Sequence, residues 1–182
     1  MAMPCLLNKK MMNKTDKQTT MRVRHEFGPF YDKDSKVLIL GSIPSPKSRE
    51  QGFYYGHPRN RFWMVLADVL GEEQSETVEQ RKLMLAKHHI ALWDVLDSCE
   101  IKGASDTSIK DPVANDMNVI LKVADIKAIF TTGAKADELY KKMCYPICGV
   151  SSIRLPSTSP ANCGCSYDIL KEAYSRILEY IK

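Results

Sequence analysis

The sequence KVLIL at residues 36–40 is a short, almost uninterrupted apolar run that ends at Gly41. Such a run is typical of a strand buried on both faces, as in a parallel sheet covered by helices. IALWD at residues 90–94 predicts a short strand or the end of one, AIFT at residues 128–131 predicts a second buried strand, and SIRL at residues 152–155 predicts a third strand. Between these runs apolar residues recur at helical spacing, which predicts helices at residues 60–70, 77–88, 115–123, 134–143 and 167–181.

Strands that alternate with helices predict an α/β fold, with helices on both faces of a parallel sheet. We expect a three-layer α/β/α domain with a short central parallel sheet of about four strands. Ligands of such sheets bind beyond the carboxyl ends of the strands. The chemistry is therefore expected in the loops at residues 41–58, 132–135 and 156–165, with a further polar loop at residues 103–112.

Length and composition agree with one globular domain. The chain has 182 residues, 44% of them hydrophobic and 26% charged, which excludes a wholly disordered, collagen-like or coiled-coil chain. We expect this domain at residues 21–182, preceded by a flexible basic arm at residues 1–20. No apolar run reaches the roughly 18 residues that span a bilayer, and no secretory signal is visible. We therefore expect a cytoplasmic protein, whose net charge of +4 permits a polyanionic partner.

The six cysteines give no support for a metal site. Cys144 and Cys148 are four positions apart, and Cys163 and Cys165 are two apart. Neither pair has the two-residue gap typical of zinc or iron–sulfur sites. Reduced thiols without a metal or cofactor are the expectation for an intracellular chain.

The loop after the first strand is the most informative part of the chain. It reads GSIPSPKSREQGFYYGHPRNRFW at residues 41–63. Gly41 lets a ligand approach the backbone closely, and aromatic side chains on a polar loop can stack on bases. We expect one of its three consecutive aromatics to fill the core. His57 and Asn60 bring an imidazole and a carboxamide together before a helix, where Asn60 is also a candidate helix cap.

Several common catalytic motifs are absent from the sequence. There is no G-x-G-x-x-G or P-loop after the first strand, and no G-x-S-x-G nucleophile motif. An aromatic loop that carries an amide suits a nucleoside or base pocket better. Asp94 and Asp116 lie near the ends of predicted elements and are expected to act only as caps.

Two separated motifs resemble those of the uracil-DNA glycosylase superfamily. The 41–63 loop resembles motif 1, in which a Gly-x-x-Pro turn is followed by an aromatic and then His-Pro-x-Asn-x-Phe-Trp. LPSTSPAN at residues 155–162 resembles motif 2, the loop that enters the DNA minor groove. ALWDVLDSCE at residues 91–100, Asn115-Asp116 and TTGAKA at residues 131–136 look most like the deoxyinosine (hypoxanthine) branch. The mismatch-specific uracil/thymine branch is also similar.

The chain departs from the mismatch-specific branch at one position of motif 1. That branch places an asparagine between Gly-x and Pro to hold the attacking water, and this chain has Ile43 there. The hypoxanthine branch also lacks this polar residue and is known for a catalytic asparagine later in motif 1. Asn60 occupies the matching position, so the resemblance favours a catalytic role for it.

The resemblance implies a monofunctional glycosylase that flips a deaminated base, chiefly hypoxanthine, out of DNA and hydrolyses its N-glycosidic bond without a cofactor. Asn60 is then expected to be catalytic, with help from His57. A lyase role for Lys47 is not indicated, and a phosphate contact is expected instead. The expected base-binding residues are Gly41, Ser42, Ser45, Tyr55 and Thr132, and the expected DNA-binding residues are Ser157, Thr158, Ser159, Pro160, Ala161 and Lys47.

Two alternatives remain open at this point. One is removal of uracil or thymine from mismatches, against which Ile43 argues. The other is a non-catalytic module that binds damaged DNA. In every case the expected partner is DNA that contains a deaminated base, and the expected state is a monomer.

Overall fold

The computed structural model describes residues 20–181, so the predicted arm lies outside the described residues except for Thr20. Its centre is a parallel sheet of four strands in the order β3-β2-β6-β7. The strands are β2 (Val37–Gly41), β3 (Ile90–Asp94), β6 (Ala128–Thr132) and β7 (Ser152–Leu155). All four lie where the apolar runs predict them. Every residue of β2 and β3 is buried, as expected for strands covered on both faces.

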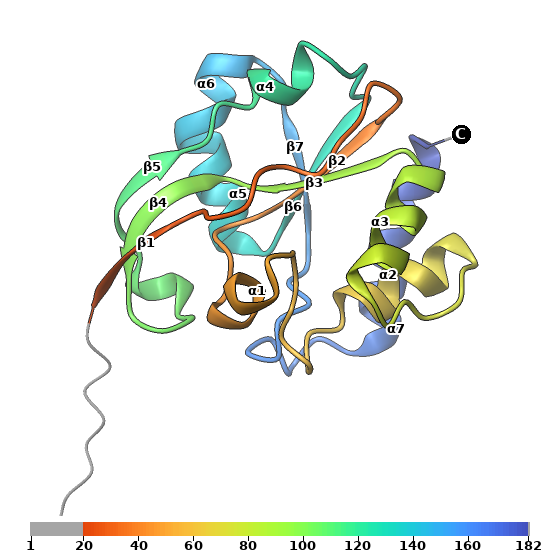
Figure 1. The fold of residues 1–182 in the computed structure, drawn as a ribbon, viewed down its shortest axis with the longest axis horizontal. Helices are drawn as coiled ribbons and strands as arrows, with labels where there is room; N and C mark the ends of the chain where they lie inside the picture. The colour runs from red at the N-terminus through yellow and green to blue at the C-terminus, as the bar shows by residue number, and fades with distance from the viewer. Residues whose placement is uncertain (1–19, 182) are drawn as a thin grey trace, which may run out of the picture.

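Helices cover both faces of this sheet, which confirms the predicted α/β/α class. In Figure 1, α4, α5 and α6 lie on one side of the strands, and α2, α3 and α7 lie on the other. The helices are α1 (Pro46–Gln51), α2 (Phe62–Leu70), α3 (Val78–Lys87), α4 (Asn118–Leu121), α5 (Ala134–Leu139), α6 (Tyr145–Cys148) and α7 (Tyr167–Ser175).

Several predicted helix lengths are wrong. The 115–123 helix is reduced to α4, and α7 passes into a 3₁₀ turn at Arg176–Glu179. The predicted 134–143 helix is α-helical only through α5 and continues as a π-helical turn at Tyr140–Cys144. The spacing of apolar residues marks the buried face, but it does not distinguish an α-helix from wider or tighter turns.

A second, antiparallel sheet was not predicted. Its strands are β1 (Met21–Arg24), β4 (Leu96–Ile101) and β5 (Lys110–Ala114), in the order β1-β4-β5. The predicted loop at 103–112 is confirmed as far as Ile109, where it includes a 3₁₀ turn at Asp106–Ser108, but it is too long because β5 begins at Lys110. Pairing between β1 and β4 joins Met21 to Ile101. β1 has only four residues and its partner strand β4 is far away in the chain, so no local sequence pattern predicts the pairing.

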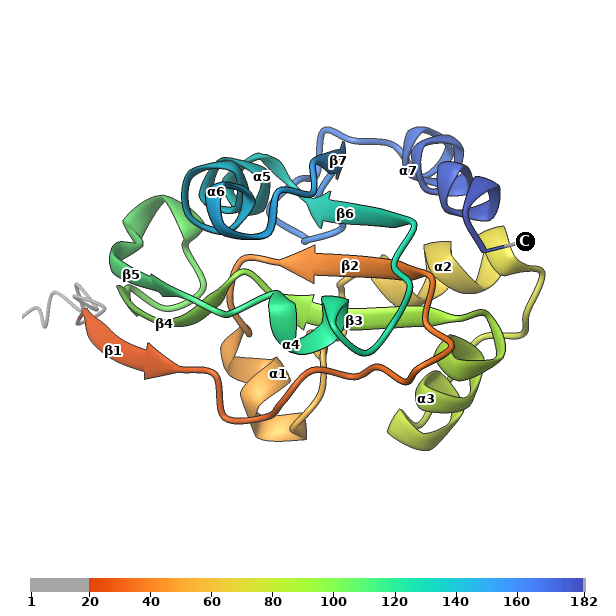
Figure 2. The same ribbon diagram turned by 90° about the horizontal axis from the view of Figure 1, so that it is seen from above.

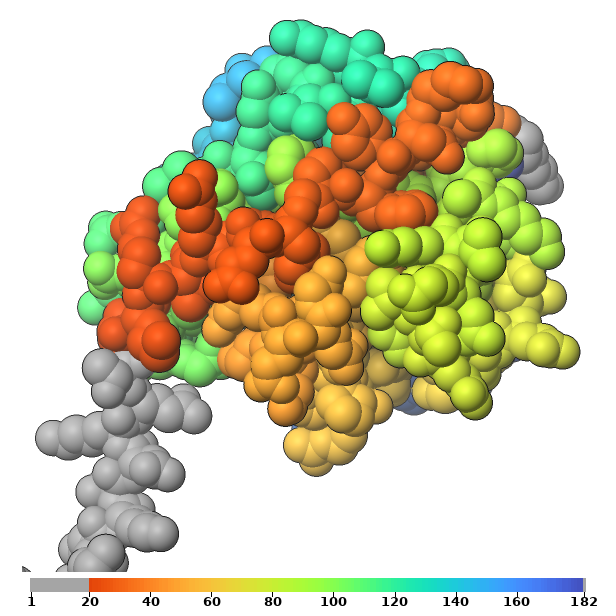
Figure 3. Space-filling model, viewed as in Figure 1, coloured from red at the N-terminus to blue at the C-terminus, as the bar shows by residue number. Residues whose placement is uncertain are grey.

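The segment that follows β1 protects the edge of the parallel sheet. Phe30 exchanges two backbone hydrogen bonds with Leu92 of β3, at 2.9 and 2.8 Å. Figure 3 shows this N-terminal segment, in red and orange, lying across the front of the molecule, and Figure 2 shows it passing along β3. It thereby covers an edge strand that would otherwise expose unpaired backbone groups.

No helix among the described residues is long and apolar enough to cross a bilayer. Within residues 20–181 no group of three or more histidine, cysteine or acidic side chains is placed to hold a metal ion.

Candidate active site

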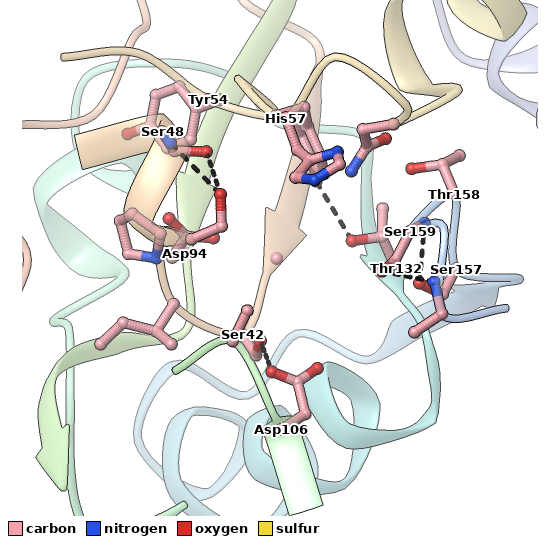
Figure 4. A pocket seen from close by; sticks show the side chains of 18 of the residues that line it. Ser42, Ser48, Tyr54, His57, Asp94, Asp106, Thr132, Ser157, Thr158 and Ser159 are labelled. Atoms are coloured by element: carbon pink, nitrogen blue, oxygen red, sulfur yellow. Dashed lines mark hydrogen bonds between the residues drawn. The ribbon is translucent and has the colours of Figure 1, made fainter. Parts of the chain in front are cut away.

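A cavity of about 260 Å³ lies at the carboxyl ends of the parallel strands. The loops that follow β2 and β7 form most of its wall, with the turn that follows β4 completing it (Figure 4). All predicted site residues except Lys47 line this cavity. Lys47 lies outside it on α1, exposed, with its Nζ 2.6 Å from Oε2 of Glu50.

Gly41 ends β2 where the cavity begins, and it lies beside Asp94 in the sheet register. A Cβ added at Gly41 would lie 2.4 Å from Oδ1 of Asp94, well inside contact distance. Glycine is therefore required at position 41 because the Asp94 carboxylate occupies the space of a side chain, whether or not a ligand is bound. The turn after Gly41 leads into α1, where Oγ of Ser45 accepts a hydrogen bond from the Ser48 amide at 3.2 Å.

The three consecutive aromatics divide between the core and the cavity. Phe53 and Tyr54 are both buried core residues, so two of them fill the core rather than one. Tyr55 stacks on Phe62 with ring centroids 3.7 Å apart and planes at 11°. Its hydroxyl lies 3.1 Å from Oγ1 of Thr132. Burial raises the pKa of Tyr55 well above its usual value, so the phenol stays neutral.

Asn60 and His57 lie together at the cavity wall. Oδ1 of Asn60 accepts a hydrogen bond from the Phe62 amide at 3.0 Å, so the side chain satisfies the first amide of α2 from one position before the N-cap residue Arg61. Its Nδ2 makes no hydrogen bond within residues 20–181. Nδ1 of His57 accepts a hydrogen bond from the Arg59 amide at 3.1 Å, which leaves Nε2 available. Capping and a functional role for Asn60 are thus geometrically compatible.

Asp94 is not a helix cap, contrary to the prediction. Its carboxylate lies in the cavity wall, with Oδ2 2.9 Å from Nε2 of His25. Both side chains are buried, with 6% and 3% exposed. Nδ2 of Asn115 donates a hydrogen bond to the Asp94 carbonyl at 3.0 Å and holds the end of β3. Asp116 lies one position before the N-cap residue Met117 of α4, and its Oδ1 accepts a hydrogen bond from the Asn118 amide, the first of the helix, at 3.0 Å.

Two further side chains link the cavity to the unpredicted sheet. Oγ of Ser42 donates a hydrogen bond to Oδ1 of Asp106 at 2.8 Å. Asp106 belongs to the turn between β4 and β5, and Figure 4 shows it on the opposite side of Ser42 from the other labelled cavity residues.

Arg61 joins the loop after β7 to the loop after β2. Its guanidinium donates hydrogen bonds to the carbonyls of Cys165 and Asn162, at 2.6 and 3.0 Å. Its backbone amide donates to the Thr158 carbonyl at 3.1 Å. Within the same loop, Nδ2 of Asn162 donates to the Ser157 carbonyl at 2.8 Å. These bonds give the two loops one fixed relative position.

A family comparison matches residues 29–182 to the uracil DNA glycosylase superfamily. The chain belongs to this superfamily. It is 37% identical over 114 residues to a hypoxanthine DNA glycosylase of Methanosarcina barkeri, covering 62% of this chain and 72% of that protein. It is 34% identical over 142 residues to a hypoxanthine DNA glycosylase of Methanosarcina acetivorans, covering 77% and 89%.

The fold of this glycosylase also matches a solved structure. A solution NMR structure from Methanosarcina acetivorans, described provisionally as a uracil DNA glycosylase, superposes with a TM-score of 0.72 at 30% identity. The match covers 87% of this chain and 99% of that one. The fold, the superfamily and the assignment as a DNA glycosylase predicted from the two motifs are therefore confirmed.

Four titratable side chains at or beside the cavity of this DNA glycosylase were given no site role by the motifs: His25, Arg61, Asp94 and Asp106. A signal existed for Asp94, because a carboxylate directly follows the wholly apolar run IALW in a predicted strand. No local pattern identifies His25 or Asp106, since both reach the site through the unpredicted antiparallel sheet.

Proposed function

We propose that this glycosylase removes deaminated bases from DNA, chiefly hypoxanthine, by hydrolysing the N-glycosidic bond of a flipped nucleotide. The observation that carries the proposal is the cavity between the motif 1 and motif 2 loops, lined by Tyr55, Asn60 and Ile43. Ile43 supplies no polar group at the position where the mismatch-specific branch holds water. The relatives named as hypoxanthine DNA glycosylases support the same substrate.

In this proposal the flipped base stacks on Tyr55, whose other ring face packs on Phe62. Negative charge builds on the base as it leaves, and preorganised backbone amides stabilise such charge most effectively. Gly41, Ser42 and Ser45 lie where their amides can serve this purpose, and Thr132 offers a hydroxyl to the base edge. Asn60, with His57 beside it, positions water or the sugar.

The motif 2 loop is proposed to hold the DNA. Hydroxyls and amides of Ser157 and Ser159 bind phosphates, whereas Thr158 is buried and supports the loop through the bond from the Arg61 amide to its carbonyl. Pro160 and Ala161 form the apolar wedge that enters the minor groove. Lys47 contacts a phosphate from outside the cavity.

The test is an excision assay on duplexes that carry one inosine, uracil or xanthine, with alkali to cut abasic sites. Wild type is expected to cleave inosine DNA well above uracil DNA. Asn60→Ala is expected to lose at least a hundredfold in single-turnover rate while it still binds inosine DNA. Asn118→Ala, which removes an exposed amide beside Asp116, is the matched control and keeps the wild-type rate.

Other outcomes would replace the proposal. If the protein cleaves uracil DNA but not inosine DNA, it is a mismatch-specific uracil/thymine glycosylase, although Ile43 argues against that reaction. Binding of inosine DNA without any base release assigns a damage-binding module. We further propose one catalytic domain at residues 21–182 that acts as a cytoplasmic monomer, which sedimentation of the purified protein and fluorescence localisation of a tagged copy would test.

A further inference from the structure

The site lacks an evident group to activate water at the usual place in motif 1. Ile43 is 9% exposed and lines the cavity, but a hydrocarbon side chain accepts no proton and orients no water. Asn60 cannot act as a base, because a carboxamide has no basic lone pair at neutral pH. A second group with proton affinity in the same cavity would therefore supply the base that neither side chain provides.

Asp94 has the geometry of such a group. Its Oδ2 is occupied by His25, whereas Oδ1 makes no hydrogen bond within residues 20–181. Oδ1 occupies the space that a side chain at Gly41 would need, because a Cβ built there would lie 2.4 Å from it. Figure 4 shows Asp94 on the same side of the pocket as Tyr54 and Ser48, with Thr132, Ser157 and Ser159 on the other side. One carboxylate oxygen is thus held in place while the other is free to bind a ligand.

The charge of Asp94 is not neutralised by a permanent cation. Among the described residues its one ion-pair partner is His25, and no lysine or arginine lies within pairing distance. The imidazole of His25 is fixed by Phe27 and Tyr54, with ring centroids at 4.7 and 5.9 Å. A fixed, poorly solvated anion is most effective where positive charge develops, as it does on a sugar that loses its base.

We propose that Asp94 is the catalytic carboxylate of the glycosylase and that His25 is its positioning residue; this inference rests on the proposed function. Asp94 accepts a proton from water as the water oxygen forms a bond to C1′ of the flipped nucleotide. The bond between C1′ and the base nitrogen breaks, and its electron pair leaves with the base. The base anion then takes a proton from solvent, and Asp94 returns its proton to solvent.

The test compares Asp94→Asn with Asp137→Asn under single-turnover conditions. Asp137 is the matched control, because it is also a buried aspartate but lies outside the cavity. Loss of a general base costs 10²–10⁴-fold in rate, so Asp94→Asn is expected to lose at least a hundredfold, with inosine-DNA affinity within threefold of wild type. Formate is expected to restore part of the rate to Asp94→Ala and none to Asn60→Ala.

His25→Gln is the second variant, because a glutamine amide can still donate to Asp94. Its rate is expected to fall about tenfold, and His25→Ala to fall further, without a loss of affinity. Wild type that is inactive on every lesion overturns the proposed function. Active wild type with full rates in Asp94→Asn and His25→Gln overturns only this inference. A hundredfold loss in Asp106→Asn instead assigns the base to Asp106.

Discussion

At the scale of single residues, the absence of a side chain at Gly41 leaves the space that the Asp94 carboxylate occupies in the cavity wall. Gly41→Ala would place a Cβ 2.4 Å from Oδ1 of Asp94, and the buried pair with His25 leaves that side chain little room to move. We expect the variant to lose at least tenfold in single-turnover excision. Gly28→Ala is the control, because a Cβ there meets nothing within 4 Å. Equal rates in the two variants would show that Asp94 rearranges freely.

At the scale of elements, Arg61 couples α2 to the loop between β7 and α7. Hydrogen bonds from a charged group contribute about 1.5–3 kcal/mol each, and Arg61 makes two, partly exposed. Arg61→Ala is expected to cost about 2 kcal/mol, which lowers the melting temperature by about 4–8 °C in a chain of this size. DNA affinity is expected to fall about tenfold, because the loop is no longer held in its binding position.

Arg22→Ala is the comparison for that variant, since Arg22 makes a single part-buried side-chain hydrogen bond, to Ser98 on the antiparallel sheet, far from the DNA-binding loop. It should change neither DNA affinity nor melting temperature appreciably. If Arg61→Ala melted lower but bound DNA with unchanged affinity, the bonds would stabilise the fold without ordering the DNA-binding loop.

Asp137 joins β6, β7 and α5 through one carboxylate. Burial alone would raise its pKa, but hydrogen bonds from Lys141, Ser152 and Thr131 outweigh that effect and lower the pKa below its usual value. Because the pKa of Asp137 is lower in the folded than in the unfolded protein, its ionised carboxylate stabilises the fold at any pH above the unfolded-state pKa, which is near 3.9. This stabilisation is lost as the pH falls through the folded-state pKa. Asp137→Asn is expected to cost about 2 kcal/mol at pH 7 and less below pH 4.

Urea unfolding from pH 7 to pH 3 would measure this difference in the free energy of unfolding. Asp125→Asn is the control, because Asp125 forms an exposed ion pair with Lys127 and such pairs contribute little. A cost for Asp137→Asn that stays constant across this pH range would rule out the ionised carboxylate as its source.

At the scale of the whole molecule, a net charge of +4 favours association with DNA but leaves the chemical step independent of salt. The logarithm of the inosine-DNA binding constant should fall linearly with the logarithm of salt concentration, by about 0.9 per phosphate contacted. Single-turnover rates at saturating protein should not change. Lys47→Ala should reduce the slope by about one unit if Lys47 binds a phosphate.

Lys127→Ala is the matched variant for that measurement. Lys127 is also exposed and paired with a nearby acid, Asp125. It directly precedes β6, at the amino ends of the parallel strands, whereas the cavity lies at their carboxyl ends. The salt dependence of DNA binding by Lys127→Ala should have the same slope as that of wild type. Equal slopes for Lys47→Ala and wild type would remove Lys47 from the DNA-binding surface.

Much of this glycosylase follows from its sequence alone. The parallel strands are largely apolar and are bounded by glycine or polar residues. Each run by itself therefore predicts a buried strand. The two motifs are also local, because each loop carries its functional side chains within a few positions of one strand end. The sequence therefore predicts that Tyr55, Asn60 and the 155–162 loop belong to one site, and in the structure they line one cavity.

The antiparallel sheet and the residues it brings to the site depended on tertiary structure. β1 and β5 are short, largely exposed strands. β1 pairs with the distant strand β4, and β5 pairs with β4 through register shifts that break any simple alternation. His25 meets Asp94 across 69 positions, and Arg61 meets Cys165 across 104. Contacts of this kind depend on where the chain returns in space, which short-range patterns of hydrophobicity do not encode. The sequence by itself thus determined the central sheet and the two motif loops, whereas only the folded chain decided which carboxylate lies against Gly41.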